Sequence, residues 1–289
     1  MHALGLLTIT IGIDPEIAKF GGLLLTWHGV FTAVGIAAGV YFAVLAARKV
    51  NYLNDDEAYT IALIGVPSAI VGARALYVME RWDEEFAHDL WSIFAVNEGG
   101  ISIYGAVIGG ILGGLIYGWI RRFPIRRGLD IGSMGLLLGM AIGRIGDIIN
   151  GEHFASESSL PWAVKYTHIN SPSFMLPPQH PAVAYEMLGD LMILGAMYFL
   201  WNRRILPRDG QVFSFFLLAY GVMRFLVSYL REDSLSIGPF TWPQVVSLGV
   251  IFLGLATAAL FQRMAPRDWV APRGAAQAEP ARAAQKARA

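Results

Sequence analysis

Long apolar runs alternate with short polar connections along the whole chain. A helix needs about 20 mostly apolar residues to cross the hydrocarbon core of a bilayer, and seven runs approach or exceed that length. They are predicted over residues 24–47, 59–79, 103–120, 129–149, 181–202, 211–230 and 241–262. The pattern therefore predicts an all-α, polytopic membrane protein with seven transmembrane helices.

Lysine and arginine gather in alternate connections between these runs. More basic side chains follow the first, third, fifth and seventh runs than follow the second, fourth and sixth. Positively charged connections stay on the cytoplasmic side of a membrane. The charge pattern therefore predicts an N-out, C-in orientation, which also requires an odd number of spans.

Four segments lie outside the predicted spans. The first 22 residues are expected to form a turn at Asp14 and a short surface helix, and residues 80–102 an aromatic and acidic arm at the membrane interface. The proline-rich residues 150–180 predict a small irregular extracytoplasmic head. Residues 264–289 predict a disordered cytoplasmic tail, because they are rich in Ala, Arg, Pro and Gln. The chain thus divides into a transmembrane domain over 1–263 and this tail.

Composition narrows the chemistry further. Hydrophobic residues make up 55% of the chain and charged residues only 15%, with a net charge of zero, so neither a soluble domain nor a nucleic-acid partner is indicated. The chain contains no cysteine, so any thiol chemistry must use a thiol on the substrate. Metal-ligand spacing, a Walker A loop and the G-x-S-x-G motif are also missing from the sequence, so we expect no metal and no cofactor.

Three arginines stand inside the apolar runs, namely Arg74, Arg144 and Arg224. An arginine there costs about 2.5 kcal/mol or more, so it should face the protein interior and meet an anion. Phosphate suits the guanidinium fork especially well. We place Arg224 in mid-span with a buried anionic partner, whereas Arg74 could be structural, paired with Glu80 or Glu98, or functional.

The segment around Arg144 concentrates polar groups at the end of the fourth run. Asp147 follows three residues later on the same helical face, which predicts an ion pair. That ion pair could simply stabilise the helix, but Asn150, Glu152 and His153 follow at once and favour a functional site. Glu186, near the outer end of the fifth run, could pair with one of these arginines or contact substrate.

Several other side chains are ambiguous from sequence alone. Ser228, one turn after Arg224, could offer a hydroxyl to a ligand. His28 is either an interfacial group or a catalyst, and Tyr104 is either an aromatic-belt residue or a catalyst. Glycines four apart in the third and fourth runs predict close helix packing, while bare backbone at Gly105 could leave room for a lipid headgroup.

Five segments, taken in order, resemble the prolipoprotein diacylglyceryl transferase family. They are IDPEIAKFGGLLLTWHG at 13–29, GGISIYGAVIGG at 99–110, GRIGDIINGEHFA at 143–155, HPAVAYEMLGD at 180–190 and YGVMRFLVSYLRED at 220–233. The resemblance covers about residues 10–262. It implies a multi-pass enzyme of the bacterial plasma membrane with its active site toward the outer leaflet. Such an enzyme transfers the sn-1,2-diacylglyceryl group from phosphatidylglycerol to the lipobox cysteine of a preprolipoprotein, forming a thioether and releasing glycerol 1-phosphate.

The resemblance also implies roles for individual residues. It places the family's essential arginines at Arg144 and Arg224, and it places its other polar and glycine positions at Gly143, Asn150, Glu152 and Tyr220. Some positions depart from the family pattern. Asp147 replaces an asparagine, His28 replaces the tyrosine of a His-Trp-Tyr sequence, Ser228 replaces a glutamate, and Tyr104 replaces a frequent histidine.

The departures leave the catalytic base open between Tyr104, His28 and water. Tyr104 has the better motif position and is favoured narrowly, although the pKa of His28 is naturally better suited to a base. Asp147 and Glu152 are expected to orient Arg144 rather than contact phosphate. The main alternative is a diverged homologue that binds phospholipid or lipopeptide without transfer. An anion transporter would need internal repeats, for which the sequence gives no convincing evidence.

Overall fold

The computed structural model describes residues 8–21, 23–49, 55–87, 89–94, 100, 102–232 and 236–266. Within them the chain is mostly helical. The α-helices are α1 (Trp27–Lys49), α2 (Asp55–Glu80), α3 (Ile103–Ile120), α4 (Ile125–Asn150), α5 (Ala182–Asn202), α6 (Gln211–Val227) and α7 (Trp242–Gln262). Six of these described helices are long and apolar enough to cross a membrane, whereas the corresponding described stretch of α3 is the shorter Ile108–Ile120. Most of the predicted tail, residues 267–289, lies outside the described residues.

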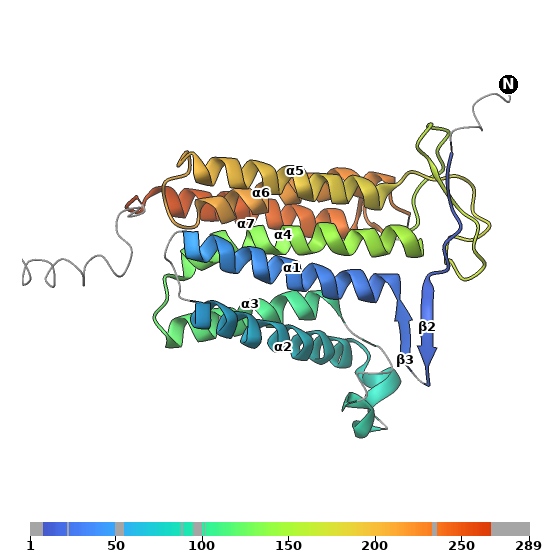
Figure 1. Ribbon diagram of the computed structural model, residues 1–289, viewed down its shortest axis with the longest axis horizontal. Coiled ribbons are helices and arrows are strands. Elements are labelled where there is room, and N and C mark those ends of the chain that lie inside the picture. The colour runs from blue at the N-terminus through green and yellow to red at the C-terminus, as the bar shows by residue number, and fades with distance from the viewer. Residues whose placement is uncertain are drawn as a thin grey trace, which may run out of the picture.

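The helices lie side by side in three layers (Figure 1). Helices α5, α6 and α7 form one layer, α1 and α4 the middle, and α2 and α3 the other side, with the main contacts between α1 and α4, α2 and α3, α4 and α5, and α6 and α7. The head and the N-terminal strands lie at one end of the bundle, to the right in Figure 1. Residues that precede α1 and α5 or follow α4 and α6 therefore meet at this head end.

Glycine allows the closest of these helix contacts. A Cβ atom built on Gly39 would lie 2.4 Å from the carbonyl oxygen of Gly135 on α4. On the other side of the bundle, a Cβ atom on Gly105 would lie 2.3 Å from the carbonyl oxygen of Gly72 on α2. Close helix packing is therefore confirmed for the predicted Gly105 and Gly135, whereas a Cβ atom on Gly114 or Gly132 would meet nothing within 4 Å.

Short strands add to the predicted all-α architecture at the N-terminus, in the head and before α7. The described residues contain three two-stranded sheets: β1 (Ile9–Ile11) with β4 (Val164–Tyr166), β2 (Glu16–Phe20) with β3 (Leu23–Thr26), and β5 (Ser236–Ile237) with β6 (Phe240–Thr241). The predicted surface helix is therefore a β-hairpin, turning at Gly21, whose φ of +59° suits glycine. β-Branched and aromatic residues favour strands over a short surface helix there.

Arg74 lies on α2 and forms hydrogen bonds to the interfacial arm. Its guanidinium donates hydrogen bonds to the carbonyl oxygens of Ser92 at 2.5 Å, Gly100 at 2.7 Å and Ile93 at 2.8 Å. The arm itself consists of a π-helical turn, Trp82–Phe86, and a 3₁₀ turn, Leu90–Phe94. These bonds support the structural interpretation of Arg74; the predicted partner Glu98 lies outside the described residues.

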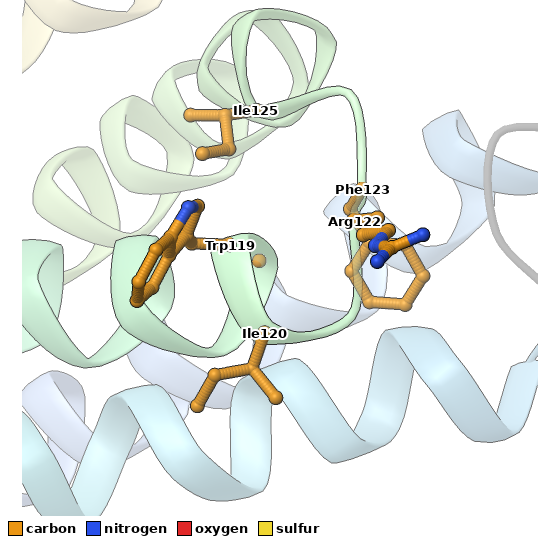
Figure 2. A pocket seen from close by; sticks show the side chains of 6 residues that line it. Trp119, Ile120, Arg122, Phe123 and Ile125 are labelled. Carbon is orange, nitrogen blue, oxygen red and sulfur yellow. The ribbon is translucent and has the colours of Figure 1, made fainter.

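A pocket lies at the opposite end of the bundle, where α3 turns into α4 (Figure 2). Its volume is about 550 Å³, and it is lined by Gly118, Trp119, Ile120, Arg122, Phe123 and Ile125. Apart from Arg122 the lining is apolar or backbone, and none of the predicted site residues contributes to it. The pocket is therefore distinct from the polar cluster at the head end.

A buried carboxylate joins α4 to the start of α6. Asp130, fully buried, accepts hydrogen bonds from the backbone nitrogens of Phe213 at 2.8 Å and Gly210 at 2.9 Å. It thus caps the N-terminus of α6 from a neighbouring helix, where negative charge is favourable.

We expect Asp130→Ala to lower the thermal stability of the purified protein, because two buried backbone donors would lose their acceptor. Unsatisfied groups of this kind cost about 1–3 kcal/mol each. Thermal unfolding in detergent measures the effect. The exposed Asp56→Ala serves as the control, and equal melting temperatures for the two variants would contradict the capping role.

Candidate active site

Three helix ends bring the charged residues together at the head end. Arg144 lies on α4 near its C-terminal end, Glu186 lies near the N-terminal end of α5, and Arg224 lies in the last turn of α6. Arg224 was predicted in mid-span; it lies in the last α-helical turn of α6, and the candidate span continues to Leu230. Figure 1 shows these ends of α4, α5 and α6 beside the head.

Glu186 pairs with both predicted arginines at once. Its Oε2 atom lies 2.5 Å from Nη2 of Arg144, and its Oε1 atom contacts Nη1 of Arg224. The Glu186 side chain is 1% exposed, so this is a buried carboxylate held between two guanidinium groups. The predicted anionic partner of Arg224 is therefore confirmed, and so is the ion pair predicted for Glu186.

Three further residues, Arg231, His153 and Asp147, close these contacts into a ring. Nη1 of Arg231 lies 3.2 Å from Oε1 of Glu186, and Nη2 of Arg231 lies 2.9 Å from Nδ1 of His153. Nε2 of His153 in turn lies 3.6 Å from Oδ2 of Asp147, which pairs with Nη1 of Arg144 at 2.9 Å. We call Arg144, Asp147, His153, Arg231, Glu186 and the attached Arg224 the charge ring.

The charge ring has a surplus of positive charge. It combines the guanidinium groups of Arg144, Arg224 and Arg231 with the carboxylates of Asp147 and Glu186. With His153 neutral, one positive charge is left uncompensated within the ring. A monoanionic phosphodiester would balance it, and guanidinium groups bind phosphate oxygens in pairs.

Sequence reasoning missed Arg231 as a member of the site, whereas His153 belonged to the polar segment after Arg144 that favoured a functional site. Arg231 was assigned to an outside connection, since it follows the predicted sixth span, yet its side chain is only 6% exposed. It reaches inward because the chain after α6 continues as a 3₁₀ turn, Ser228–Leu230, and then forms a bridge to Ala155 in the head. Arg231 belongs to the segment 220–233 that resembles the family, but its place in the sequence does not indicate that its side chain is buried.

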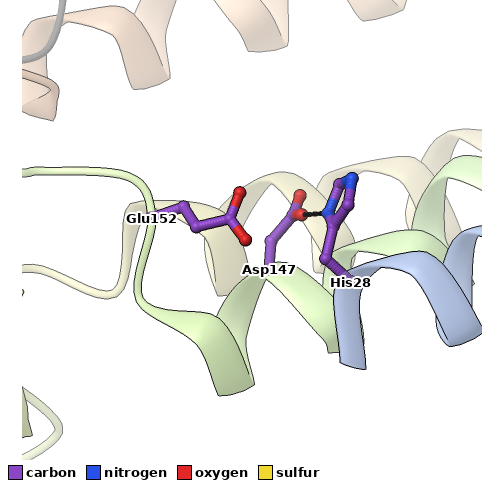
Figure 3. Close-up of side chains that lie close together, drawn as sticks. All are labelled: His28, Asp147 and Glu152. Carbon is purple, nitrogen blue, oxygen red and sulfur yellow. Dashed lines mark hydrogen bonds and ion pairs between the residues drawn. The ribbon is translucent and has the colours of Figure 1, made fainter. Parts of the chain in front are cut away.

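Asp147 connects the charge ring to His28 and lies beside Glu152 (Figure 3). Nδ1 of His28 lies 2.5 Å from Oδ1 of Asp147. Gly146 makes this approach possible, because a Cβ atom there would lie 2.7 Å from the Cα atom of His28 and from the carbonyl oxygen of Trp27. The start of α1 therefore packs directly on the backbone of α4 beside the arginine site.

We expect Gly146→Ala to reduce activity strongly while leaving the protein membrane-inserted, since the added methyl would push the backbone of residues 27–28 away from α4. Displacement of a catalytic group by about 1 Å can cost about 100-fold in rate. The measurement is product formation per folded molecule. Gly132→Ala is the control on the same helix, because a Cβ atom there meets nothing within 4 Å. Equal activity of both variants would contradict the need for this close approach.

The head holds the C-terminal end of α4. The hydroxyls of Ser173, Tyr166 and Ser171 donate hydrogen bonds to the carbonyl oxygens of Gly151, Ile148 and Asn150 at 2.7, 2.8 and 2.9 Å. Burial raises the pKa of Tyr166 to about 12, so its hydroxyl stays protonated and keeps donating. Gly151 ends the helix with a φ of +71°, as helix C-caps commonly do.

This anchored helix end also presents Asn150 and Glu152. The Asn150 side chain donates a hydrogen bond to Oε1 of Glu152, and the Asn150 Oδ1 atom is buried without a hydrogen-bond partner. Glu152 lies near His28 and Asp147, with one ligand atom of each within 4.8 Å of the others. A cation there would compete with the Arg144 guanidinium and the His28 ring for Asp147, so the cluster is better suited to hydrogen bonding.

The remaining predicted site residues are distributed around this cluster. Tyr220 stacks on Phe216 of α6 at 5.7 Å between ring centroids. The Ser228 hydroxyl is buried and donates to the Arg224 carbonyl oxygen at 2.7 Å, which ties it to its own helix. Gly143 lies one residue before Arg144, and a Cβ atom there would meet only Thr32 Oγ1, at 4.0 Å.

The last two predicted site residues, Gly105 and Tyr104, belong to α3. Gly105 packs against α2, so its role at a lipid headgroup stays a prediction. Tyr104 belongs to α3, but its side chain lies outside what the structure describes.

Comparison with known proteins matches this chain to one family. A family model described as prolipoprotein diacylglyceryl transferase matches residues 15–260. A curated protein from Nostoc sp., named phosphatidylglycerol–prolipoprotein diacylglyceryl transferase, is 33% identical over 89% of this chain and 93% of its own length. Proteins of the same name from Finegoldia magna and Gloeobacter violaceus are 34% and 35% identical over 81% and 83% of this chain, and each match covers 90% of the relative.

Proposed function

The chain belongs to the prolipoprotein diacylglyceryl transferase family, and we propose how it transfers a diacylglyceryl group from phosphatidylglycerol to a prolipoprotein. The acceptor is the lipobox cysteine thiol of the prolipoprotein, and the products are a thioether and glycerol 1-phosphate. The observation that carries the proposal is the charge ring, in which three guanidinium groups surround two carboxylates at one end of a membrane-type bundle.

The phosphate of phosphatidylglycerol binds to Arg144 and Arg224 in this proposal. Both guanidinium groups are already held by Glu186 on α5, which fixes their positions before substrate arrives. Preorganised positive charge aimed at a developing anion is often the largest contribution to catalysis. Asp147 and Glu152 orient the cationic groups and leave the phosphate contacts to the arginines.

The reaction displaces the phosphate from a carbon atom of the glyceryl group. The thiolate of the acceptor attacks the glyceryl carbon that carries the phosphate, a carbon–sulfur bond forms, and the carbon–oxygen bond breaks. The electron pair of that bond leaves on the phosphate, which gains a negative charge that Arg144 and Arg224 stabilise. A free thiol has a pKa of about 8.5, so the thiol proton must pass to a base near neutral pH.

Two side chains are candidates for that base, Tyr104 and His28. Tyr104 occupies the family position that often carries a histidine. His28 contacts Asp147 and thereby connects to the charge ring. Asn150, Tyr220, Ser228, Gly105 and Gly143 are proposed to shape the surroundings of the lipid headgroup and the peptide.

The orientation that suits this chemistry is N-out and C-in, with seven spans including α3 and the active site toward the outer leaflet of a bacterial plasma membrane. Arg121 and Arg122 lie between α3 and α4, at the end of the bundle away from the head. Cationic connections favour the cytoplasmic side, so the head and charge ring face outward. Phosphatidylglycerol and the membrane-anchored peptide then reach the site from the bilayer.

The test is transfer of radiolabelled diacylglyceryl from phosphatidylglycerol to a lipobox peptide by the purified protein. The expected result is a thioether product whose formation requires the cysteine of the peptide. A folded protein that binds phosphatidylglycerol but yields no product would instead support a diverged homologue that binds lipid without transfer.

A further inference from the structure

Two positions at which the sequence departs from the family pattern contact one another. By the resemblance to the family, His28 on α1 stands where a tyrosine is usual, and Asp147 on α4 stands where an asparagine is usual. Their side chains meet at 2.5 Å between Nδ1 and Oδ1. The two departures therefore form one pair, in which a neutral phenol and amide are replaced by an imidazole and a carboxylate.

The surroundings of Asp147 decide which ring nitrogen of His28 carries the proton. Oδ2 of Asp147 accepts a hydrogen bond from Nη1 of Arg144 at 2.9 Å. A carboxylate that pairs with a guanidinium is ionised and can only accept hydrogen bonds. Nδ1 of His28 is therefore the donor to Asp147, and Nε2 of the neutral ring keeps a free lone pair.

The lone pair on Nε2 is directed toward accessible space. Figure 3 shows the second ring nitrogen turned away from the Asp147 carboxylate, with Glu152 on the opposite side of Asp147. The His28 side chain is 45% exposed, whereas Asp147 is 6% exposed. Asp147 is thus fixed inside the protein, whereas the ring of His28 is accessible to a substrate.

We propose that His28 is the catalytic base of this chain, and that Asp147 positions it; the proposal rests on the transferase function proposed above. Nε2 accepts the proton of the cysteine thiol as the carbon–sulfur bond forms. The proton then passes to the leaving glycerol phosphate or to water, which returns the ring to its neutral state. Asp147 holds the tautomer and stabilises the imidazolium.

The pair also couples proton transfer to phosphate binding. Asp147 contacts both His28 and Arg144, so a single carboxylate orients the base and one phosphate-binding guanidinium. The titratable groups that act on His28 in the described part of the chain are Asp147 on α4, and Glu152 and His153 just beyond it. This assignment leaves Tyr104 without the role of base.

The test compares wild type with His28→Gln on two acceptor peptides that differ in one atom. One peptide carries the lipobox cysteine, and the other carries selenocysteine, whose selenol is already ionised at neutral pH and needs no base. We expect His28→Gln to lose about 100-fold or more of cysteine transfer and to retain most of selenocysteine transfer. Cysteine transfer by the variant should also recover as the pH approaches the thiol pKa of about 8.5.

Each outcome separates this proposal from the function on which it rests. Loss of transfer to both peptides would overturn the role as base, because a merely structural defect affects both acceptors. Full cysteine transfer by His28→Gln would overturn it while leaving the transferase function intact. Absence of product from wild type would count against the function itself. His168→Gln, a histidine in the head beside Asp14, is the matched control and should keep full activity on both peptides.

Discussion

Arg144→Ala and Arg224→Ala are each expected to reduce diacylglyceryl transfer by about 100-fold or more, which is the effect of removing one preorganised donor to a developing oxyanion. Each substitution removes a guanidinium that Glu186 holds in the charge ring. The negative charge on the leaving phosphate would then develop without one of its partners. The largest change should appear in kcat, because the missing interaction grows stronger as the phosphate leaves.

The measurement is steady-state transfer at several phosphatidylglycerol concentrations, with folded protein verified by thermal unfolding. Arg144→Lys and Arg224→Lys should recover only part of the activity, since lysine keeps the charge but lacks the planar fork. Arg203→Ala is the control, because Arg203 lies after α5 at the end away from the head. An alanine variant with more than half of wild-type kcat would rule out the proposed phosphate contact for that arginine.

The sequence was a good guide to features that depend on local pattern. The predicted fifth and seventh spans, 181–202 and 241–262, differ from α5 and α7 by a single residue at one end. The arginines were also recognisable, because a charge inside an apolar run must have a partner. The identity of that partner was open, and the structure places one carboxylate, Glu186, between Arg144 and Arg224.

Features that depend on contacts between distant segments could not be predicted in this way. Arg231 lies beyond the end of α6 and looks like an ordinary surface arginine in the sequence. Its side chain points inward because residue 231 forms a bridge to Ala155. A contact between segments so far apart in the sequence cannot be predicted from the local pattern of either one. The pairing of His28 with Asp147, 119 residues apart, likewise depends on the packing of α1 against Gly146.

The N-terminal hairpin shows the same limit at the level of secondary structure. Residues 16–26 were divided between a surface helix and the first span, but they form β2 and β3. The strand β1 pairs with β4 of the head, so the N-terminal segment and the head support each other. Together they hold the end of α4, and with it Asn150 and Glu152, in a fixed position beside the arginines.

Glu186→Gln is expected to destabilise the protein by about 3–5 kcal/mol, which is the cost of removing one partner from a buried ion pair. Glutamine fills the same space, so the loss is electrostatic. Arg144, Arg224 and Arg231 would face one another across a neutral amide, with Asp147 as the remaining carboxylate of the charge ring. Transfer activity should fall as well, because mutual repulsion would displace the two phosphate-binding groups.

Added phosphatidylglycerol distinguishes this electrostatic explanation from a general packing defect. Its phosphate supplies the missing negative charge, so it should bind the folded state and raise the melting temperature of Glu186→Gln more than that of wild type. Phosphatidylethanolamine vesicles, without net charge, give the reference shift, and the exposed Glu16→Gln on β2 is the control substitution. The electrostatic role of Glu186 would be contradicted if Glu186→Gln were as stable as wild type. It would also be contradicted if phosphatidylglycerol raised the melting temperatures of both proteins equally.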